Sequence, residues 1–186
     1  MSSKKFSLIA AACENMGIGS KGSLPWRLKN ELKYFNQQTT KTIDGSKKNA
    51  LIMGRKTYFG IPENKRPLPG RLNIVLSTTS TQSDYPSEVL LCKTFNEAIG
   101  KLSDPKLCED IENIWIVGGH TVYKEAMESP LCHRVYLTEI MATYDCDAFF
   151  PAIPADFQLV ANDDGLPSDI QEENGIKYQY KIYEKL

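Results

Sequence analysis

The stretch Ile114-Trp-Ile-Val-Gly-Gly-His-Thr-Val-Tyr123 contains the pattern that decides the fold. Its first four residues form an apolar run, which is typical of a strand covered on both faces. Two glycines follow, and a helix is predicted near Thr121–Glu128. At such a junction the first backbone N–H groups of the helix can face an anion, and glycine lets the anion come close. The stretch therefore predicts one strand–turn–helix unit of an α/β protein.

A second stretch, Leu51-Ile-Met-Gly-Arg-Lys-Thr57, has the same pattern and adds two cations and a hydroxyl group. Each junction alone is compatible with a tight turn that needs positive φ or with a phosphate site. Two of them in one chain favour a cofactor that carries a diphosphate. The stretch Gly17-Ile-Gly-Ser-Lys-Gly22 matches the dinucleotide fingerprint only formally, because Ser23-Leu-Pro-Trp26 follows it instead of a helix. We interpret it as a flexible loop.

Further elements extend this pattern in both directions along the chain. Strands are predicted at Phe6–Ala12, Asn49–Met53, Leu72–Leu76, Val89–Cys92, Ile114–Val117 and Val135–Ile140, with late extended segments near Phe157–Ala161 and Ile176–Tyr183. Helices are predicted at Lys29–Thr39, after Gly54, and from the capping box Thr94-Phe-Asn-Glu97 to about Leu102, with loops at Cys13–Pro25 and Ile61–Arg71. Strands alternating with helices predict an α/β fold whose sheet is largely parallel, with an antiparallel C-terminal margin.

Composition excludes several classes of protein. The 186 residues include 22 basic and 23 acidic side chains, a net charge of -1, so no overall field would attract nucleic acid or an anionic membrane. No apolar run approaches the ~18 residues of a membrane span. Because no linker or repeat divides the chain, we expect a single domain over residues 1–186.

The cysteines and histidines argue against disulfides and metals. The five cysteines are odd in number and widely spaced, which favours reduced thiols and a cytoplasmic location. The two histidines, His120 and His133, lie far apart, and no acidic cluster has ligand spacing, so no metal site is predicted. Neither G-x-S-x-G nor a Walker sequence occurs. By elimination, a bound cofactor would supply the chemistry.

Three charged residues have a structural interpretation, and one of them, Glu31, also has a functional one. Glu31 lies in the first turn of the predicted helix, where acids are favoured for electrostatic reasons. Its position between Leu28 and Leu32 is also compatible with a buried carboxylate that binds an amidine-like cation. Arg71 and Lys93 follow a loop and a strand, respectively, where most such cations are simply solvated.

The chain also resembles a known family. The series Asn15-Met-Gly-Ile-Gly19, Leu24-Pro-Trp26, Met53-Gly-Arg-Lys-Thr57, Gly70-Arg71, Ile116-Val-Gly-Gly119, Val122-Tyr123 and Thr138 resembles the signature motifs of dihydrofolate reductases, in order and spacing, from about Phe6 to the C-terminus. Phe149-Phe-Pro151 and Gly175-Ile-Lys-Tyr178 resemble animal members in particular. The resemblance implies a single-domain, eight-stranded, mostly parallel sheet with flanking helices. It also implies a monomeric, monofunctional enzyme of one-carbon metabolism that reduces dihydrofolate with NADPH and binds antifolates.

The resemblance assigns site residues by position. Glu31 would hold the pterin 2-amino group and N3, with Thr138 behind it, and Arg71 would clamp the folate α-carboxylate. The catalytic positions are Leu24, Trp26, Glu31, Tyr123 and Thr138, and the other substrate-binding positions are Ile9, Ala11, Leu32, Phe35, Ile61, Leu68, Arg71 and Val117. The cofactor-binding positions are Ala11, Ile18, Gly19, Gly22, Ser23, Gly54, Arg55, Lys56, Thr57, Leu76, Ser77, Thr78, Lys93, Val117, Gly118, Gly119, His120, Thr121, Val122 and Tyr123. The loop Met16–Ser23 would close over the nicotinamide, and the bond Gly118-Gly119 would be cis.

Three departures from the family pattern modify these expectations. Thr78 stands where many animal members have arginine, which would weaken the 2′-phosphate pocket. Trp26 and Glu31 are one residue closer than in vertebrate members, and Leu32 replaces a frequent phenylalanine. Two alternatives remain open at this stage. One is a related pterin or pyrimidine reductase, and the other is a nucleotide- or RNA-binding module that has lost catalysis.

Overall fold

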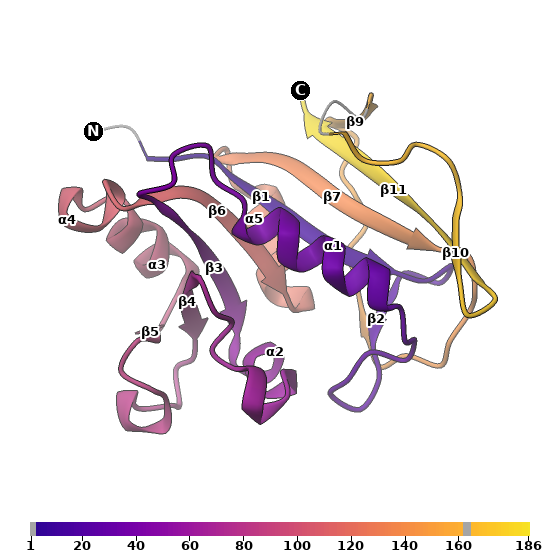
Figure 1. Ribbon diagram of the computed structural model, residues 1–186. Coiled ribbons are helices and arrows are strands. Elements are labelled where there is room, and N and C mark those ends of the chain that lie inside the picture. Colours follow the sequence, from indigo (N-terminus) through magenta and orange to yellow (C-terminus); the bar gives the residue numbers. More distant parts are fainter. Residues whose placement is uncertain (1–2, 162–164) are drawn as a thin grey trace.

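The computed structural model describes residues 3–161 and 165–186, and its centre is a twisted mixed sheet (Figure 1). Within these residues nine strands form the main sheet, in the order β10-β11-β7-β1-β6-β3-β4-β5, with β9 paired to β11. The strands are β1 (Phe6–Ala12), β3 (Lys48–Gly54), β4 (Arg71–Leu76), β5 (Leu90–Cys92), β6 (Ile111–Gly118), β7 (Cys132–Ile140), β9 (Phe157–Val160), β10 (Gln171–Glu173) and β11 (Ile176–Lys185). The strands from β7 to β5 pair in parallel, whereas β9, β10 and β11 pair antiparallel.

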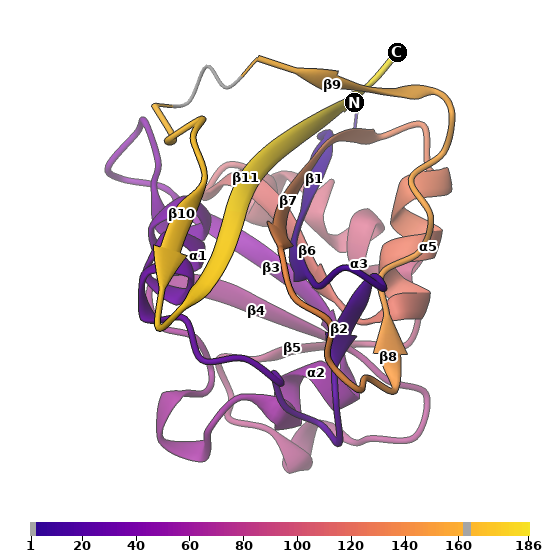
Figure 2. The same ribbon diagram turned by 90° about the vertical axis from the view of Figure 1, so that its right-hand side faces the viewer.

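Helices cover both faces of this sheet (Figure 2). They are α1 (Lys29–Thr40), α2 (Arg55–Gly60), α3 (Phe95–Leu102), α4 (Pro105–Cys108) and α5 (His120–Glu128). Side chains of β1 alternate between the faces, as the pleat requires. Leu8 packs in the cluster that includes residues of α3 and α5, and Ile9 packs in the cluster that includes Tyr34 of α1. The apolar run of β1 is therefore explained by burial on both sides.

Polar contacts from distant segments fix the ends of α1. The N–H groups of Lys29 and Asn30 donate to the two carboxylate oxygens of Glu173 in β10, at 2.8 and 2.9 Å. These donors have no partner within a helix, so a carboxylate from another segment satisfies them. At the other end, Asn49 Nδ2 donates to the carbonyls of Thr39 and Lys41 at 2.8 and 3.0 Å. Both ends of the helix that carries Glu31 are thus anchored.

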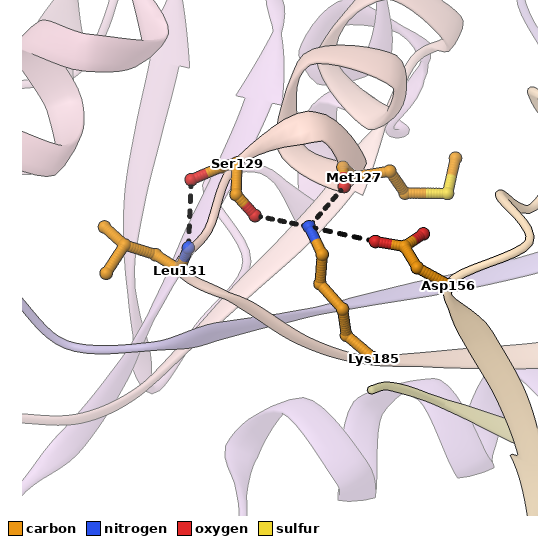
Figure 3. A network of polar contacts seen from close by, with 5 residues as sticks. All are labelled: Met127, Ser129, Leu131, Asp156 and Lys185. Atoms are coloured by element: carbon orange, nitrogen blue, oxygen red, sulfur yellow. Dashed lines mark hydrogen bonds and ion pairs between the residues drawn. The ribbon is translucent and has the colours of Figure 1, made fainter.

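A lysine from β11 fixes the C-terminal end of α5 (Figure 3). Lys185 Nζ donates to the carbonyl oxygens of Met127 and Ser129 at 3.1 and 2.9 Å, and Asp156 Oδ2 lies 3.9 Å away. The last carbonyls of a helix lack intrahelical donors, and a cation there also interacts favourably with the helix dipole. Strand β11 therefore holds α5 against the sheet.

The predicted core elements are confirmed, with ends that shift by up to a few residues, but short elements were missed. The segment expected to be the loop Cys13–Pro25 contains β2 (Gly17–Gly19), which pairs antiparallel with β8 (Ala148–Phe149). A three-residue strand has too little alternation to be recognised, and its partner is distant in sequence. Short 3₁₀ helices at Glu63–Lys65 and Gln82–Asp84 and the one-turn helix α4 were also missed.

The two glycine junctions differ in backbone geometry. Gly118 has φ of 127°, as a glycine-dependent turn requires, and the Gly118-Gly119 bond is cis. Gly54 has φ of -74°, so the interpretation of that junction as a positive-φ turn is wrong. A Cβ there would meet only ordinary contacts, the nearest being Val122 Cγ2 at 3.6 Å. No helix among the described residues has the length and apolarity of a membrane span.

Candidate active site

A cavity of about 230 Å³ lies at the carboxyl ends of β1 and β6, where ligands bind in open α/β sheets. Strands β1 and β6 supply its floor, α1 one wall, and the segment between β1 and α1 another. Its lining residues are Ile9, Ala10, Ala11, Ile18, Leu24, Glu31, Leu32, Phe35, Thr57, Val117, Gly118, Gly119 and Tyr123. All of these except Ala10 were assigned to the site from the sequence. Ala10 could have been included, because it lies between two assigned residues of one strand.

Glu31 is the one carboxylate among these lining residues, and it is buried. It lies in the first turn of α1 and faces the sheet, so the functional interpretation of this residue fits the structure better than a solvated first-turn acid. Burial raises the pKa of Glu31 to about 7, and a hydrogen bond from the Thr138 hydroxyl, 3.0 Å long, opposes that rise. The Thr138 side chain comes from β7 and is itself buried. The cavity therefore contains one carboxyl group that is poised between its two protonation states near neutral pH.

Tyr123 fixes the opposite wall of the cavity. Its hydroxyl donates to the carbonyl of Ile9 at 2.8 Å, which joins α5 to β1 beneath the cavity. Burial raises the pKa of Tyr123, so its hydroxyl remains a neutral donor. A Cβ at Gly118 would lie 3.3 Å from Thr57 Oγ1 and 3.4 Å from Tyr123. The glycine is thus required by both its φ and its close neighbours.

A second hollow, of about 380 Å³, is lined by Arg55, Phe59, Thr79, Ser80 and Asp84. Of these only Arg55 was assigned to the site from the sequence. The hydroxyl of Ser80 accepts from Ser77 Oγ at 2.9 Å, so the assigned Ser77 lies directly behind the hollow. Ser77 N–H donates to the carbonyl of Cys92, the residue before the exposed Lys93. Arg55, Ser77 and Lys93 therefore follow the carboxyl ends of three neighbouring strands, β3, β4 and β5.

Arg71 is buried at the start of β4 and is oriented by α1. Its Nη1 donates to Asn36 Oδ1 at 3.1 Å and to Thr39 Oγ1 at 2.9 Å, and its Nε donates to the Pro69 carbonyl at 3.0 Å. Burial lowers its pKa. Within the described residues no carboxylate pairs with this guanidinium, and Nη2 has no hydrogen bond. A buried arginine that is oriented but not neutralised is suited to bind an anionic ligand.

The remaining assigned residues lie outside both hollows. Ile61 and Leu68 are half-buried and pack in the cluster with Tyr34 and Phe35, next to the wall formed by α1. Trp26 is buried, packs against Tyr144 at a ring distance of 5.6 Å, and its Nε1 has no partner among the described residues. Gly19, Gly22, Ser23, Gly54, Lys56, Leu76, Thr78, Thr121 and Val122 line neither hollow. His120 is exposed at the start of α5, with Nδ1 2.8 Å from the Phe149 carbonyl.

Comparison with known proteins decides the family. A family model described as dihydrofolate reductase matches residues 5–185. The chain belongs to the dihydrofolate reductase family. It is 64% identical over 183 residues to the dihydrofolate reductase of Aedes albopictus, with 98% of each chain covered. It is 60% identical to that of Drosophila melanogaster over 97% of this chain and 98% of the relative. The Schistosoma mansoni dihydrofolate reductase structure superposes with a TM-score of 0.87 at 35% identity, and each chain is covered completely.

The expected fold and family are therefore confirmed, and the mixed sheet is the dihydrofolate reductase fold. The sheet has one strand more than the eight expected, because β9 pairs with one end of β11. The described residues contain no group of three or more His, Cys, Asp or Glu side chains that could hold a metal ion.

Proposed function

We propose that this dihydrofolate reductase reduces 7,8-dihydrofolate to tetrahydrofolate with NADPH, and that Glu31 is its catalytic carboxyl group. The dihydrofolate reductase activity itself follows from full-length relatives at up to 64% identity. The observation that carries the assignment of Glu31 is its buried carboxyl group in the wall of an otherwise mainly apolar cavity. A carboxylate there pairs with the amino-pyrimidine edge of a pterin through two parallel hydrogen bonds.

The apolar wall supports the binding of flat rings. Ile9, Phe35 and Val117 line the cavity with side chains that exclude water. Exclusion of water strengthens the interaction of Glu31 with the ring and fixes the two reacting rings face to face. Leu32 is 46% exposed at this wall. Because its side chain is smaller than that of phenylalanine, it offers less contact area to a ring. Of the α1 residues that line the cavity, Phe35 is therefore the one that supplies an aromatic ring.

Arg71 fits the anionic end of the substrate. Its fixed guanidinium lies at the far end of α1 from Glu31, so an elongated ligand could contact both. We propose that free N–H groups of Arg71 bind the folate α-carboxylate. Lysine would be a poor replacement, since it has no planar fork.

The residues present fit NADPH, which when bound would supply the hydride to C6 of the pterin. The first N–H groups of α5 have no side-chain cap, as suits a helix end that faces phosphate oxygens. Arg55, Lys56 and Thr57 would contact the diphosphate or the 2′-phosphate, and Gly118 and Gly119 would allow close approach. Arg55, Ser77 and Lys93 would favour NADPH over NADH. Isothermal titration calorimetry with NADPH and with NADH measures the two Kd values and tests this preference. Equal Kd values would contradict it.

Glu31 polarises the ring rather than protonating N5 directly. The carboxyl group is held by Thr138 of β7, which lies outside the cavity lining. We propose that an ordered water molecule delivers the proton to N5, while Tyr123 and Ile9 hold the floor in place. A neutral fraction of Glu31 is present near pH 7 because of its raised pKa.

Replacement of Glu31 tests this function. Glu31→Gln keeps the size of the side chain but cannot ionise, so turnover of dihydrofolate should fall by about 10²-fold or more. The affinity for NADPH should not change. Glu125→Gln, on the exposed face of α5, is the matched control. Turnover of the Glu31 variant near the wild-type value would contradict the role of this residue.

A substrate panel distinguishes related reductases. NADPH oxidation is compared with dihydrofolate and with other reducible pterins and pyrimidines. We expect dihydrofolate to give the highest kcat/KM, because only a substrate with a carboxylate tail can use Arg71. A diaminopteridine antifolate should quench the fluorescence of Trp26 on binding. A higher kcat/KM for another heterocycle would favour the alternative reductase.

The number of domains, the oligomeric state and the location of the protein are part of the same proposal. We propose that residues 1–186 form a single domain that acts as a monomer in the cytoplasm. All five cysteines are free, which fits a reducing compartment. Size-exclusion chromatography with light scattering tests the monomer, and a mass of twice 20.9 kDa would contradict it.

A further inference from the structure

Two cysteines that lie 133 residues apart in sequence face each other at the base of the loop Met16–Ser23. Cys13 Sγ and Cys146 Sγ are 4.0 Å apart. Cys13 is buried directly after β1, and Cys146 is half-buried just before β8. Their sulfurs would have to approach by about 2 Å to reach the ~2.05 Å length of a disulfide bond.

The surroundings of the pair hold the two segments together. Cys13 Sγ donates to Asn15 Oδ1 at 2.8 Å, and the same oxygen accepts from Gly17 N–H at 3.1 Å. Asn15 Nδ2 donates to the Tyr144 carbonyl at 3.1 Å. A Cβ at Gly17 would lie 2.3 Å from Cys146 Sγ, so only glycine leaves room for the second sulfur. The fold therefore brings the two thiols together, and Gly17 leaves room for the Cys146 sulfur.

We propose that Cys13 and Cys146 are a redox-sensitive pair, which a peroxide converts to a disulfide that restrains the loop Met16–Ser23. The loop starts three residues after Cys13, and β2 within it pairs with β8 next to Cys146. Asp147 adds two contacts, because its N–H donates to the Gly19 carbonyl and its Oδ2 accepts from Lys21 N–H, both at 3.0 Å. A covalent bond between the thiols would join the two ends of this paired segment.

The reaction balances with hydrogen peroxide as oxidant. The Cys146 thiolate attacks one peroxide oxygen, the O–O bond breaks, and a sulfenic acid forms as hydroxide leaves and is protonated to water. The Cys13 thiol then attacks the Cys146 sulfur, the S–S bond forms, and the sulfenic oxygen leaves as a second water. Two electrons pass from the thiols to the peroxide. Burial and the adjacent Cys13 raise the pKa of Cys146, so its reactive thiolate is a minor fraction at neutral pH and the first step is slow.

The disulfide would make the loop Met16–Ser23 less accessible to a protease. Lys21 is exposed at the tip of the segment and Ile18 lines the cavity. Trp26, Cys13, Tyr144 and Cys146 pack in one cluster, so the indole fluorescence also reports the state of the pair. The other three cysteines lie on different elements, and Cys108 in α4 is the best control because it is also half-buried.

The experiment measures covalent state and loop accessibility in the purified full chain. After treatment with hydrogen peroxide, intact mass should fall by about 2 Da through loss of two hydrogens, and peptide mapping should show Cys13 linked to Cys146. Trypsin cleavage after Lys21 should slow severalfold, and a thiol reductant should restore it. Cys146→Ser should abolish both changes, whereas Cys108→Ser should retain them.

Three results would overturn the proposal. They are the absence of the mass loss, a linkage between other cysteines, and unchanged cleavage after Lys21 once the disulfide has formed. Gly17→Ala supplies a second variant, since its methyl group would displace Cys146 Sγ and slow the linkage. Because mass and proteolysis are independent of turnover, these outcomes are separate from the tests of the reductase function.

Discussion

The hydroxyl of Thr138 in β7 donates a hydrogen bond of 3.0 Å to Oε1 of Glu31 in α1. This contact lowers the pKa of a carboxyl group that burial raises to about 7. It joins the sheet to the helix that forms one wall of the cavity, and it leaves the second carboxylate oxygen for a ligand. The protonation state of the site near neutral pH therefore depends on a residue that does not line the cavity.

Thr138→Val should shift the pH dependence of catalysis. Without the hydroxyl, desolvation acts unopposed, so the pKa of Glu31 rises further and the midpoint of the kcat/KM profile moves to higher pH. The profile is measured with dihydrofolate between pH 5 and 10. Thr143→Val, at an exposed position, is the matched control and should leave the midpoint in place. A midpoint that stays fixed or falls in Thr138→Val would contradict this role.

Glu31 should make stability depend on pH. Its pKa rises from the usual 4.5 to about 7 on folding, so the folded state binds the proton more tightly. The stability from this group is complete below the unfolded pKa and is lost as pH rises through about 7. The total loss is about 3 kcal/mol, of which about 2 kcal/mol falls between pH 5.5 and 8.5.

Urea unfolding of the wild type and Glu31→Gln at these two pH values measures that difference. The variant should lose about 2 kcal/mol less than the wild type on going to the higher pH, because glutamine has no proton to release. An identical pH dependence in both proteins would show that Glu31 ionises normally in the folded state.

Arg71→Lys should weaken substrate binding and leave the chemical step intact. Loss of a charge-assisted hydrogen bond costs about 1.5–3 kcal/mol, so KM for dihydrofolate should rise about tenfold to a hundredfold at similar kcat. A dihydropteridine without the glutamate tail serves as control, because its KM should not change. If both substrates lose affinity equally, Arg71 acts through the position of α1 instead.

Glu173→Gln should destabilise the protein by about 1 kcal/mol. The carboxylate accepts the N–H groups of Lys29 and Asn30, and a neutral amide offers only one acceptor and no charge to this helix terminus. Urea unfolding at pH 7 measures the change. Glu172→Gln, the exposed neighbour in β10, should have almost no effect. Equal stabilities for the two variants would be evidence against the cap.

Lys185→Met should also lower stability, by about 1 kcal/mol, since it removes the donors to the Met127 and Ser129 carbonyls and keeps the apolar stem. Thermal unfolding followed by circular dichroism measures the loss. Lys177→Met is an exposed control on the same strand. A control variant that unfolds at the same temperature as Lys185→Met would argue against a specific contact.

The sequence predicted the core of the fold because its strong signals are local. The apolar runs of β1, β3 and β6 and the capping box before α3 each lie within a few residues, and Thr94 Oγ1 does accept from Glu97 N–H. For the site, the family resemblance assigned twelve of the thirteen residues that line the main cavity, seven of them within the ordered motifs. Their chemical roles were implied by the family rather than by any pattern in the chain.

Contacts between distant residues could not be predicted from local signals. The cap from Glu173 spans 144 residues to Lys29, and Cys13 meets Cys146 only because β2 pairs with β8. The hollow beside Arg55 includes Phe59 of α2, Thr79 of an irregular segment and Asp84 of the 3₁₀ helix Gln82–Asp84. Their proximity follows from the parallel order of β3, β4 and β5, which periodicity does not determine.

The anchoring of α1 at both ends makes the position of Glu31 depend on residues outside the cavity. Glu173 of β10 holds the first turn of the helix, Asn49 holds the last, and Thr138 holds the Glu31 carboxyl group itself. A substitution in the surface hairpin formed by β10 and β11 should therefore alter the geometry of a cavity that it does not touch.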